Sequence, residues 1–157
     1  MRKFFEFTLY EDDWERRVIR FYPKTTHVHG FGDEPPMKWE CVYKAYLSFA
    51  VLHFNKETGK AHVAYNARWD ECSGLNDLAY WLEHPGANTE PVFHTRVFGD
   101  ATQWIIMPWG ESFKLVTMCP LHAGKSYVFW LENEKIPEFA KVINEYLDYS
   151  LAHSEGI

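Results

Sequence analysis

Alternation of apolar and polar residues predicts β-strands along most of this chain. Near the N-terminus, residues 3–10 (KFFEFTLY) show the period of two that marks a half-buried strand. Residues 17–22 (RVIRFY) form a second such run, which stops at Pro23. We expect these two runs to pair as a hairpin, with a short third strand over residues 25–30.

The clearest hairpin signal lies between residues 43–54 and 61–69, which are joined by the turn sequence NKETGK. Asn55 can accept backbone hydrogen bonds to start this turn, and Gly59 can supply the positive φ that ends it. The first arm is apolar on both faces, which indicates a central strand covered on both sides. The second arm is expected to alternate through four residues on one face: Val63, Tyr65, Ala67 and Trp69.

Two segments have helical spacing instead. Residues 73–84 carry leucines and an alanine at i, i+3, i+4 and i+7, and the sequence Pro-Gly follows them, so a short helix is predicted there. Residues 136–151 predict a longer amphipathic helix. Its apolar stripe comprises Ile136, Phe139, Ala140, Ile143, Tyr146, Leu147 and Leu151, and its charged face comprises Glu138, Lys141, Glu145 and Asp148.

Between the two helices, residues 91–98, 102–108, 112–119 and 126–132 read as strands separated by short turns. Short connections favour antiparallel neighbours, so a four-stranded meander is predicted. The fold class is therefore α+β: a mainly antiparallel sheet of about seven or eight strands, with the short middle helix and the C-terminal helix packed on it. One domain covering residues 1–157 is expected, with a Gly- and Pro-rich loop at 30–38.

Composition adds one unusual number, an aromatic content of 18%. Large rings suit a pleated, half-buried surface, so a core of large side chains explains them. An exposed aromatic platform for a ligand or partner is the alternative, and the sequence alone does not separate the two. The location of the rings therefore decides between a structural and a functional interpretation.

The net charge of −6 is unevenly placed along the chain. Residues 1–78 hold 11 basic and 12 acidic side chains, whereas residues 79–157 hold 5 and 10. An acidic surface disfavours non-specific binding to nucleic acid or to anionic membranes, and it suits a protein partner with a basic surface. An ordinary solvated acidic face is the alternative.

Cysteine usage and hydropathy indicate a compartment. Cys41, Cys72 and Cys119 are odd in number and widely spaced, which favours free thiols in a reducing environment. We find no signal-peptide pattern and no apolar stretch that approaches the length of a membrane span. A cytoplasmic location without membrane contact is expected.

A candidate metal site begins at His27 and His29, which share one side of a strand because they are two residues apart. Together with Glu34 they form the string HVHGFGDE, which resembles the first metal motif of the cupin family. That resemblance implies a divalent metal held inside a β-barrel by these three residues. The string departs from the motif because it lacks the glycines that flank it, and no second motif with a further histidine follows. No other cofactor is expected.

A second candidate is the pair His53 and His62. If the hairpin closes around residues 56–59, these two histidines face each other across the strands with their Cβ atoms about 5 Å apart. Such a pair can bind a metal or titrate near neutral pH. Two neutral histidines near an exposed hairpin end are the alternative, and a register slip of one residue would separate the pair.

The sequence contains no strong catalytic motif. Cys119 and His122 form the only close Cys/His pair, for which packing or simple exposure is the simpler interpretation. The chain contains no P-loop, dinucleotide-binding glycine motif, HExxH, GxSxG or EF-hand sequence. These absences remove the commonest nucleotide, hydrolase and calcium hypotheses, and they leave open a site assembled from dispersed residues.

Three functions from different classes remain. The first is a non-enzymatic interaction protein of the inhibitor, immunity or phage-antagonist type, whose acidic and aromatic surface meets a basic partner. The second is a small-molecule binder or metal-dependent enzyme with an aromatic-lined β pocket. The third is a self-associating structural subunit, such as a homodimer joined through a strand edge or the helix.

Overall fold

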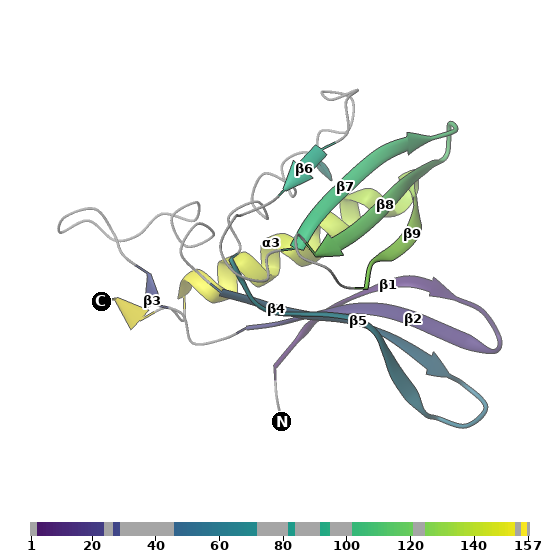
Figure 1. The fold of residues 1–157 in the computed structure, drawn as a ribbon, viewed down its shortest axis with the longest axis horizontal. Helices are drawn as coiled ribbons and strands as arrows, with labels where there is room; N and C mark the ends of the chain where they lie inside the picture. The colour runs from purple at the N-terminus through teal and green to yellow at the C-terminus, as the bar shows by residue number, and fades with distance from the viewer. Residues whose placement is uncertain are drawn as a thin grey trace.

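The computed structural model describes residues 3–23, 27–28, 46–71, 82–83, 92–94, 102–120, 125–152 and 155–156. These residues form an α+β fold with two antiparallel sheets and one long helix at the C-terminal end (Figure 1). The α+β class predicted from the sequence is thus confirmed. The single large sheet is wrong, because most of the described strands divide into two four-stranded sheets that diverge from each other in Figure 1, and two short strands form a separate pair.

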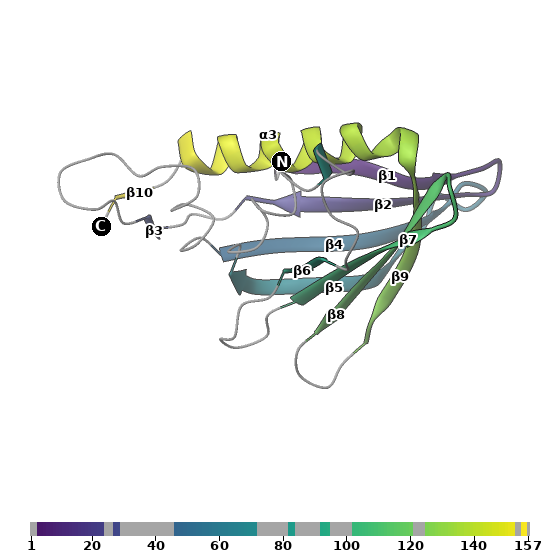
Figure 2. The ribbon, with the colours of Figure 1, turned by 90° about the horizontal axis from the view of Figure 1, so that it is seen from above.

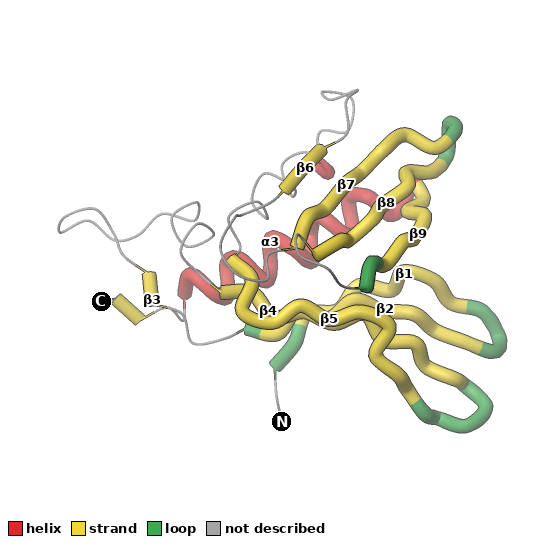
Figure 3. The backbone as a smooth tube through the Cα atoms, viewed as in Figure 1, coloured by secondary structure: helices red, strands yellow, loops and turns green. Residues whose placement is uncertain are grey.

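The first sheet has the strand order β1-β2-β4-β5, with all neighbours antiparallel. Its strands are β1 (Phe5–Glu11), β2 (Glu15–Tyr22), β4 (Tyr46–Asn55) and β5 (Ala61–Glu71). Both predicted hairpins are confirmed, and β4 occupies an interior position as its apolar sequence indicates. Figure 3 shows the turns of the two hairpins, in green, beside each other at one end of this sheet.

The second sheet has the order β6-β7-β8-β9 and is also antiparallel throughout. It consists of β6 (Val92–His94), β7 (Thr102–Trp109), β8 (Phe113–Pro120) and β9 (Tyr127–Glu132). The order along the chain equals the order in space, as a meander requires. Three of the predicted meander strands are matched over most of their length, and the first is described for only three residues.

Helix α3 (Ile136–Ala152) follows β9 through the short 3₁₀ turn η1 (Asn133–Lys135). Figure 2 shows that α3 runs along the β1 side of the first sheet, while β7, β8 and β9 cross that sheet at an angle. The predicted apolar stripe is buried at every described side chain, and the four charged residues predicted opposite it are exposed. The 3.6-residue spacing therefore fixes which face of this helix packs inward.

Aromatic rings join the two sheets and the helix into one core. Phe139 of α3 is fully buried and stacks on Phe7 of β1 at a ring-centroid distance of 4.8 Å. Its ring also lies 6.4 Å from that of Trp104 in β7, which in turn lies 5.4 Å from Phe49 in β4. Since a buried ring removes on the order of 150–250 Å² from water, these contacts account for a large share of the fold's stability. Many of the aromatic residues are therefore structural.

Two β-bulges lie at the same level of the first sheet. The register of β1 against β2 shifts at Leu9, and that of β5 against β4 shifts at Ala64. Both bulges flank the pair Val18 and Leu52, which are direct partners in the two central strands. The alternation predicted for β5 is wrong for this reason: the extra residue leaves Val63 52% exposed while Tyr65 is buried. Bulges bend a strand and increase its twist, so the sheet changes direction along this line.

Several predicted features lie wholly or partly outside the described residues. Of the predicted middle helix, Leu82 and Glu83 are helical and the rest is not described. The predicted third strand is represented by β3 (His27–Val28), which pairs in parallel with β10 (Glu155–Gly156). The 30–38 loop is not described. Within the described part of the chain, no helix has the length and apolar character needed to cross a membrane.

Candidate functional site

Beyond the two bulges, the inner face of the first sheet changes from apolar to polar. Tyr10, Arg17, His53 and His62 are successive cross-strand partners and form one row across β1, β2, β4 and β5. On the core side of the bulges, the corresponding positions hold buried apolar residues such as Val51. We call the four residues the polar row. It lies between the hydrophobic core and the two hairpin turns.

The two histidines of the polar row are paired as the sequence predicts. His53 lies opposite His62, and their ring centroids are 5.0 Å apart with an interplanar angle of 74°. His53 Nε2 also lies 3.0 Å from the hydroxyl oxygen of Tyr127, which comes from β9 of the other sheet. The predicted register is therefore confirmed at this pair, between the turn and the bulge at Ala64, and His53 additionally connects the two sheets.

Burial and a neighbouring cation set the electrostatics of this row. Partial burial lowers the pKa of His53 below its ordinary value, and the positive charge of Arg17 lowers it further. Burial raises the pKa of Tyr127. Arg17 is held by Glu15, whose Oε1 accepts a hydrogen bond from Nη2 at 2.8 Å, and this contact raises the pKa of Arg17. Burial and Arg17 thus both favour the neutral form of the His53 imidazole.

Short polar side chains shape the two turns next to the polar row. Asp12 Oδ1 accepts hydrogen bonds from the backbone N–H groups of Trp14 and Glu15 at 2.8 and 2.7 Å. Asn55 Oδ1 plays the same part in the other turn and accepts from the N–H groups of Glu57 and Thr58. This turn closes at Gly59 with φ of 72°, as the sequence predicts.

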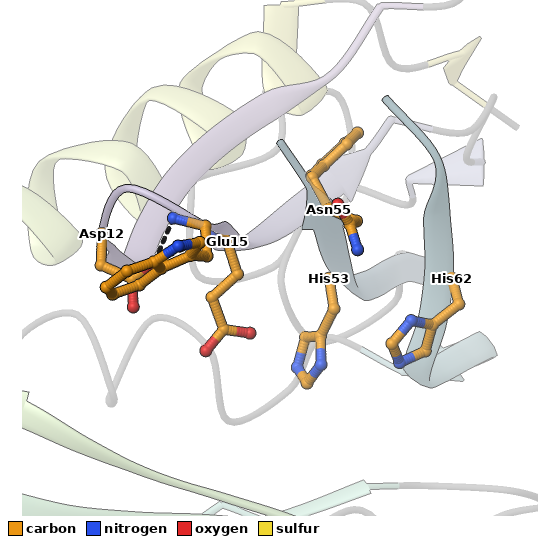
Figure 4. Close-up of a pocket in the computed structure, with 7 residues that line it drawn as sticks. Asp12, Glu15, His53, Asn55 and His62 are labelled. Atoms are coloured by element: carbon orange, nitrogen blue, oxygen red, sulfur yellow. Dashed lines mark hydrogen bonds between the residues drawn. The ribbon is translucent and has the colours of Figure 1, made fainter. Parts of the chain in front are cut away.

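A cavity of about 440 Å³ lies between these turns and the polar row. It is lined chiefly by Asp12, Trp14, Glu15, His53, Asn55 and His62, and we call it the hairpin cavity. Figure 4 shows the Glu15 carboxylate and both imidazoles projecting from the same side of the sheet. The Lys56 N–H donates a hydrogen bond to the Trp14 carbonyl at 2.9 Å, which ties the two turns together. The volume lies within the usual range for small-molecule sites.

The predicted metal site lies almost wholly outside the described residues. The structure gives the backbone of His27 in β3, whereas His29 and Glu34 are not described. The site therefore stays a prediction. Within the described residues, no group of three or more His, Cys, Asp or Glu side chains is placed to hold a metal ion. Cys119 is a free thiol, and its predicted neighbour His122 is not described.

The outer face of the first sheet is partly covered by its own charged side chains, although Phe4 and Val63 on it are 39% and 52% exposed. Glu6 forms ion pairs with both Arg16 and Arg20, and the Arg20 pair has an N–O distance of 2.6 Å. Both guanidinium groups lie over the ring of Phe54, and Arg20 also lies 4.2 Å from the centroid of Phe4. Val18 is fully buried on this side of the sheet. We call Phe4, Glu6, Arg16, Arg20 and Phe54 the arginine cluster.

The outer face of the second sheet is open by comparison. Large apolar side chains are exposed there, namely Trp109 (54%), Phe113 (39%), Val128 (45%) and Trp130 (54%). Trp109 faces Phe113 across one strand pair, and Leu115 faces Trp130 across the next. We call these five residues the aromatic face. A groove of about 310 Å³ borders it, with Phe113, Val128 and Trp130 in its wall. The charged residues of the same wall are two acids and two bases, namely Glu11, Glu132, Arg17 and Lys135.

Sequence reasoning missed most of the residues that complete the hairpin cavity and the polar row. Arg17 carried a usable signal, because it shares strand parity with the buried residues Ile19 and Phe21, and a cation on an apolar face needs a reason. Tyr127 gave no signal, since its approach to His53 depends on how the two sheets are inclined. For Trp14, the sequence indicated only a position in a turn.

No protein-family model matches the sequence, and no curated protein matches it significantly. The aromatic face and the hairpin cavity are therefore the features of the described residues that bear on function.

Proposed function

We propose that this chain is a protein-interaction module that binds a partner with a basic surface through the aromatic face. The observation that carries the proposal is the exposure of Trp109, Phe113, Val128 and Trp130 on one side of a sheet. Clustered exposed apolar residues mark interaction surfaces, and tryptophan is among the residues that dominate binding energy. The adjacent groove offers a place for an anchoring side chain of the partner.

Charge supports a basic partner. Glu132 is exposed on the same side of β9 as Trp130, and Glu111 is exposed in the turn beside Trp109. The outward positions of β7, β8 and β9 hold no Lys or Arg among the described residues. An arginine of the partner can stack on an exposed indole and pair with a nearby carboxylate, which joins both attractions in one contact.

Site-specific photo-crosslinking in the cell of origin tests the proposal. A photoreactive residue at position 130 is expected to capture a discrete partner, whereas the same residue at position 57, in the exposed turn of the first sheet, is expected to capture none. With the captured partner purified, Trp130→Ala should weaken binding at least about tenfold. Equal capture at both positions, or unchanged affinity after Trp130→Ala, would contradict the proposal.

Self-association through the same face is the competing outcome. Analytical ultracentrifugation over a hundredfold concentration range distinguishes it from binding to another protein. A dimer that dissociates in Trp130→Ala would assign the face to a second copy of this chain and overturn the basic-partner proposal. A concentration-independent monomer is the expected result.

A further inference from the structure

We propose that the hairpin cavity is a binding site for a neutral saccharide, separate from the aromatic face. Its 440 Å³ suits one or two pyranose rings, given the usual sizes of ligand pockets. Saccharide binding here does not depend on the proposed protein interaction, because the cavity lies on the first sheet and shares no residue with the aromatic face.

The cavity holds hydrogen-bonding groups that the fold does not use. The Trp14 indole N–H, the Asn55 amide N–H₂ and both ring nitrogens of His62 make no hydrogen bond with the described residues. Asn55 uses only its carbonyl oxygen, which shapes the turn. These groups come from three different strand ends and line one space, so a ligand rich in hydroxyl groups can satisfy several of them together.

The cavity also has an apolar platform. The side chain of Trp14 is 73% exposed at the tip of its hairpin. An indole presents a flat apolar surface with a polar N–H at its edge. A pyranose ring is its counterpart, because its C–H groups form an apolar face while its hydroxyl groups point outward around the edge.

Local charge compensation favours a neutral ligand over a cation. Glu15 is paired with Arg17 at 2.8 Å. Asp12 accepts two backbone N–H groups and the Tyr10 hydroxyl, and these hydrogen bonds hold its pKa below the ordinary value. Both carboxylates keep unused lone pairs that can accept from sugar hydroxyls, but neither is an unpaired charge that requires a cation.

The cavity walls are preorganised, which lowers the cost of ordering them on binding. The two turns are joined by the hydrogen bond between the Lys56 N–H and the Trp14 carbonyl, and by an ion pair between Lys56 and Glu11 at 3.0 Å. Each turn is fixed separately by its Asp or Asn side chain. Rigid walls favour affinity, because fewer side-chain and loop motions are lost when a ligand enters.

Protein-observed NMR with the full chain tests this proposal. The probes are the methyl glycosides of glucose, galactose, mannose and N-acetylglucosamine, each titrated to about 50 mM, and methylguanidinium as a cationic comparison. At least one glycoside should shift the Trp14 indole resonance, with a dissociation constant on the order of 1 mM. Trp14→Ala and His62→Ala should each weaken that binding about tenfold or more, and both side chains are exposed, so the fold is expected to survive.

Trp130→Ala is the matched control, because it removes an exposed indole from the aromatic face and leaves the cavity intact. It should leave the saccharide affinity unchanged even if the protein-interaction proposal fails. The cavity proposal is overturned if no glycoside produces a shift, if Trp14→Ala binds as well as the unaltered chain, or if methylguanidinium binds more tightly than every glycoside.

Discussion

The outer faces of the two sheets use similar rings in opposite ways. On the first sheet, the arginine cluster lays two guanidinium groups over Phe54 and neutralises them with Glu6. On the second sheet, Trp109 and Trp130 remain more than half exposed. The difference shows that this chain can lay its own charged side chains over the rings of a sheet face, as it does over Phe54 on the first sheet. The exposure of Trp109 and Trp130 on the aromatic face is therefore consistent with a role of this face in binding.

The largest expected effect comes from removing the ring on which both sheets pack. Phe139→Ala should lower the free energy of unfolding by about 3–5 kcal/mol, because Phe139 is fully buried against β1 and β7. Urea denaturation followed by both circular dichroism and tryptophan fluorescence measures the loss. Glu138→Ala, at an exposed neighbouring position, should change stability by less than about 0.5 kcal/mol. Separate transitions for the two probes would show that the sheets do not share a core.

A smaller loss of stability is expected when the arginine cluster loses the negative charge of Glu6. Glu6→Gln should cost about 1–2 kcal/mol, because two partly buried guanidinium groups lose their anionic partner. Chemical denaturation at low and high salt measures this cost, and the difference should shrink as salt rises. Glu57→Gln in the exposed turn is the control and should be neutral. A neutral Glu6→Gln would mean that the rings, and not the ion pairs, cover this face.

The open face should tolerate substitution better than the closed one. Trp130→Thr should change the free energy of unfolding by less than about 1 kcal/mol, because the indole is 54% exposed and threonine suits a strand. Thermal unfolding compared with that of Glu6→Gln provides the measurement. A loss greater than that of Glu6→Gln would show that the aromatic face is structural, and it would remove the contrast between the two sheets.

The smallest expected effect is the pH dependence of stability that comes from His53, which lies between the two sheets. Because the pKa of His53 is lower in the folded chain than its ordinary 6.5, the unfolded chain binds more protons as the pH falls through that value. Stability should therefore decrease with acidification from about pH 7.5 to pH 5.5, and part of this decrease should disappear in His53→Gln. Denaturation at several pH values measures both. The effect is modest because the imidazole is only partly buried. An identical pH dependence in the variant would show that other groups cause the decrease.

Local patterns predicted most of the elements but not their assembly. The turn at Asn55 and Gly59 and the pairing of His53 with His62 follow from turn chemistry and a period of two. The buried stripe of α3 follows from the spacing of its apolar residues. Each of these depends on residues that are close along the chain or opposite one another in a hairpin, so the sequence contains what is needed.

The division into two sheets and most of the site depend on long-range geometry. The contact between His53 and Tyr127 joins residues 74 positions apart, and no local pattern encodes it. The bulge at Ala64 was also missed, because a small apolar residue there fits regular alternation equally well. The exposure of Trp130 and the burial of Trp104 are set by which side of the second sheet faces the helix, a choice that alternation alone leaves open.

The paired bulges at Leu9 and Ala64 have a consequence for how this chain can change. They divide the first sheet into a supporting half, whose side chains must fit the core, and a terminal half, whose inward side chains line the hairpin cavity and contact one another and Tyr127 of β9. Substitutions in the terminal half leave the core packing intact, while the strand backbone still holds the new side chains at fixed spacings. At the hairpin ends, side chains can therefore be substituted as freely as in a loop, while their spacing stays fixed by the strands. This makes the hairpin ends a suitable place to evolve or engineer a new binding specificity.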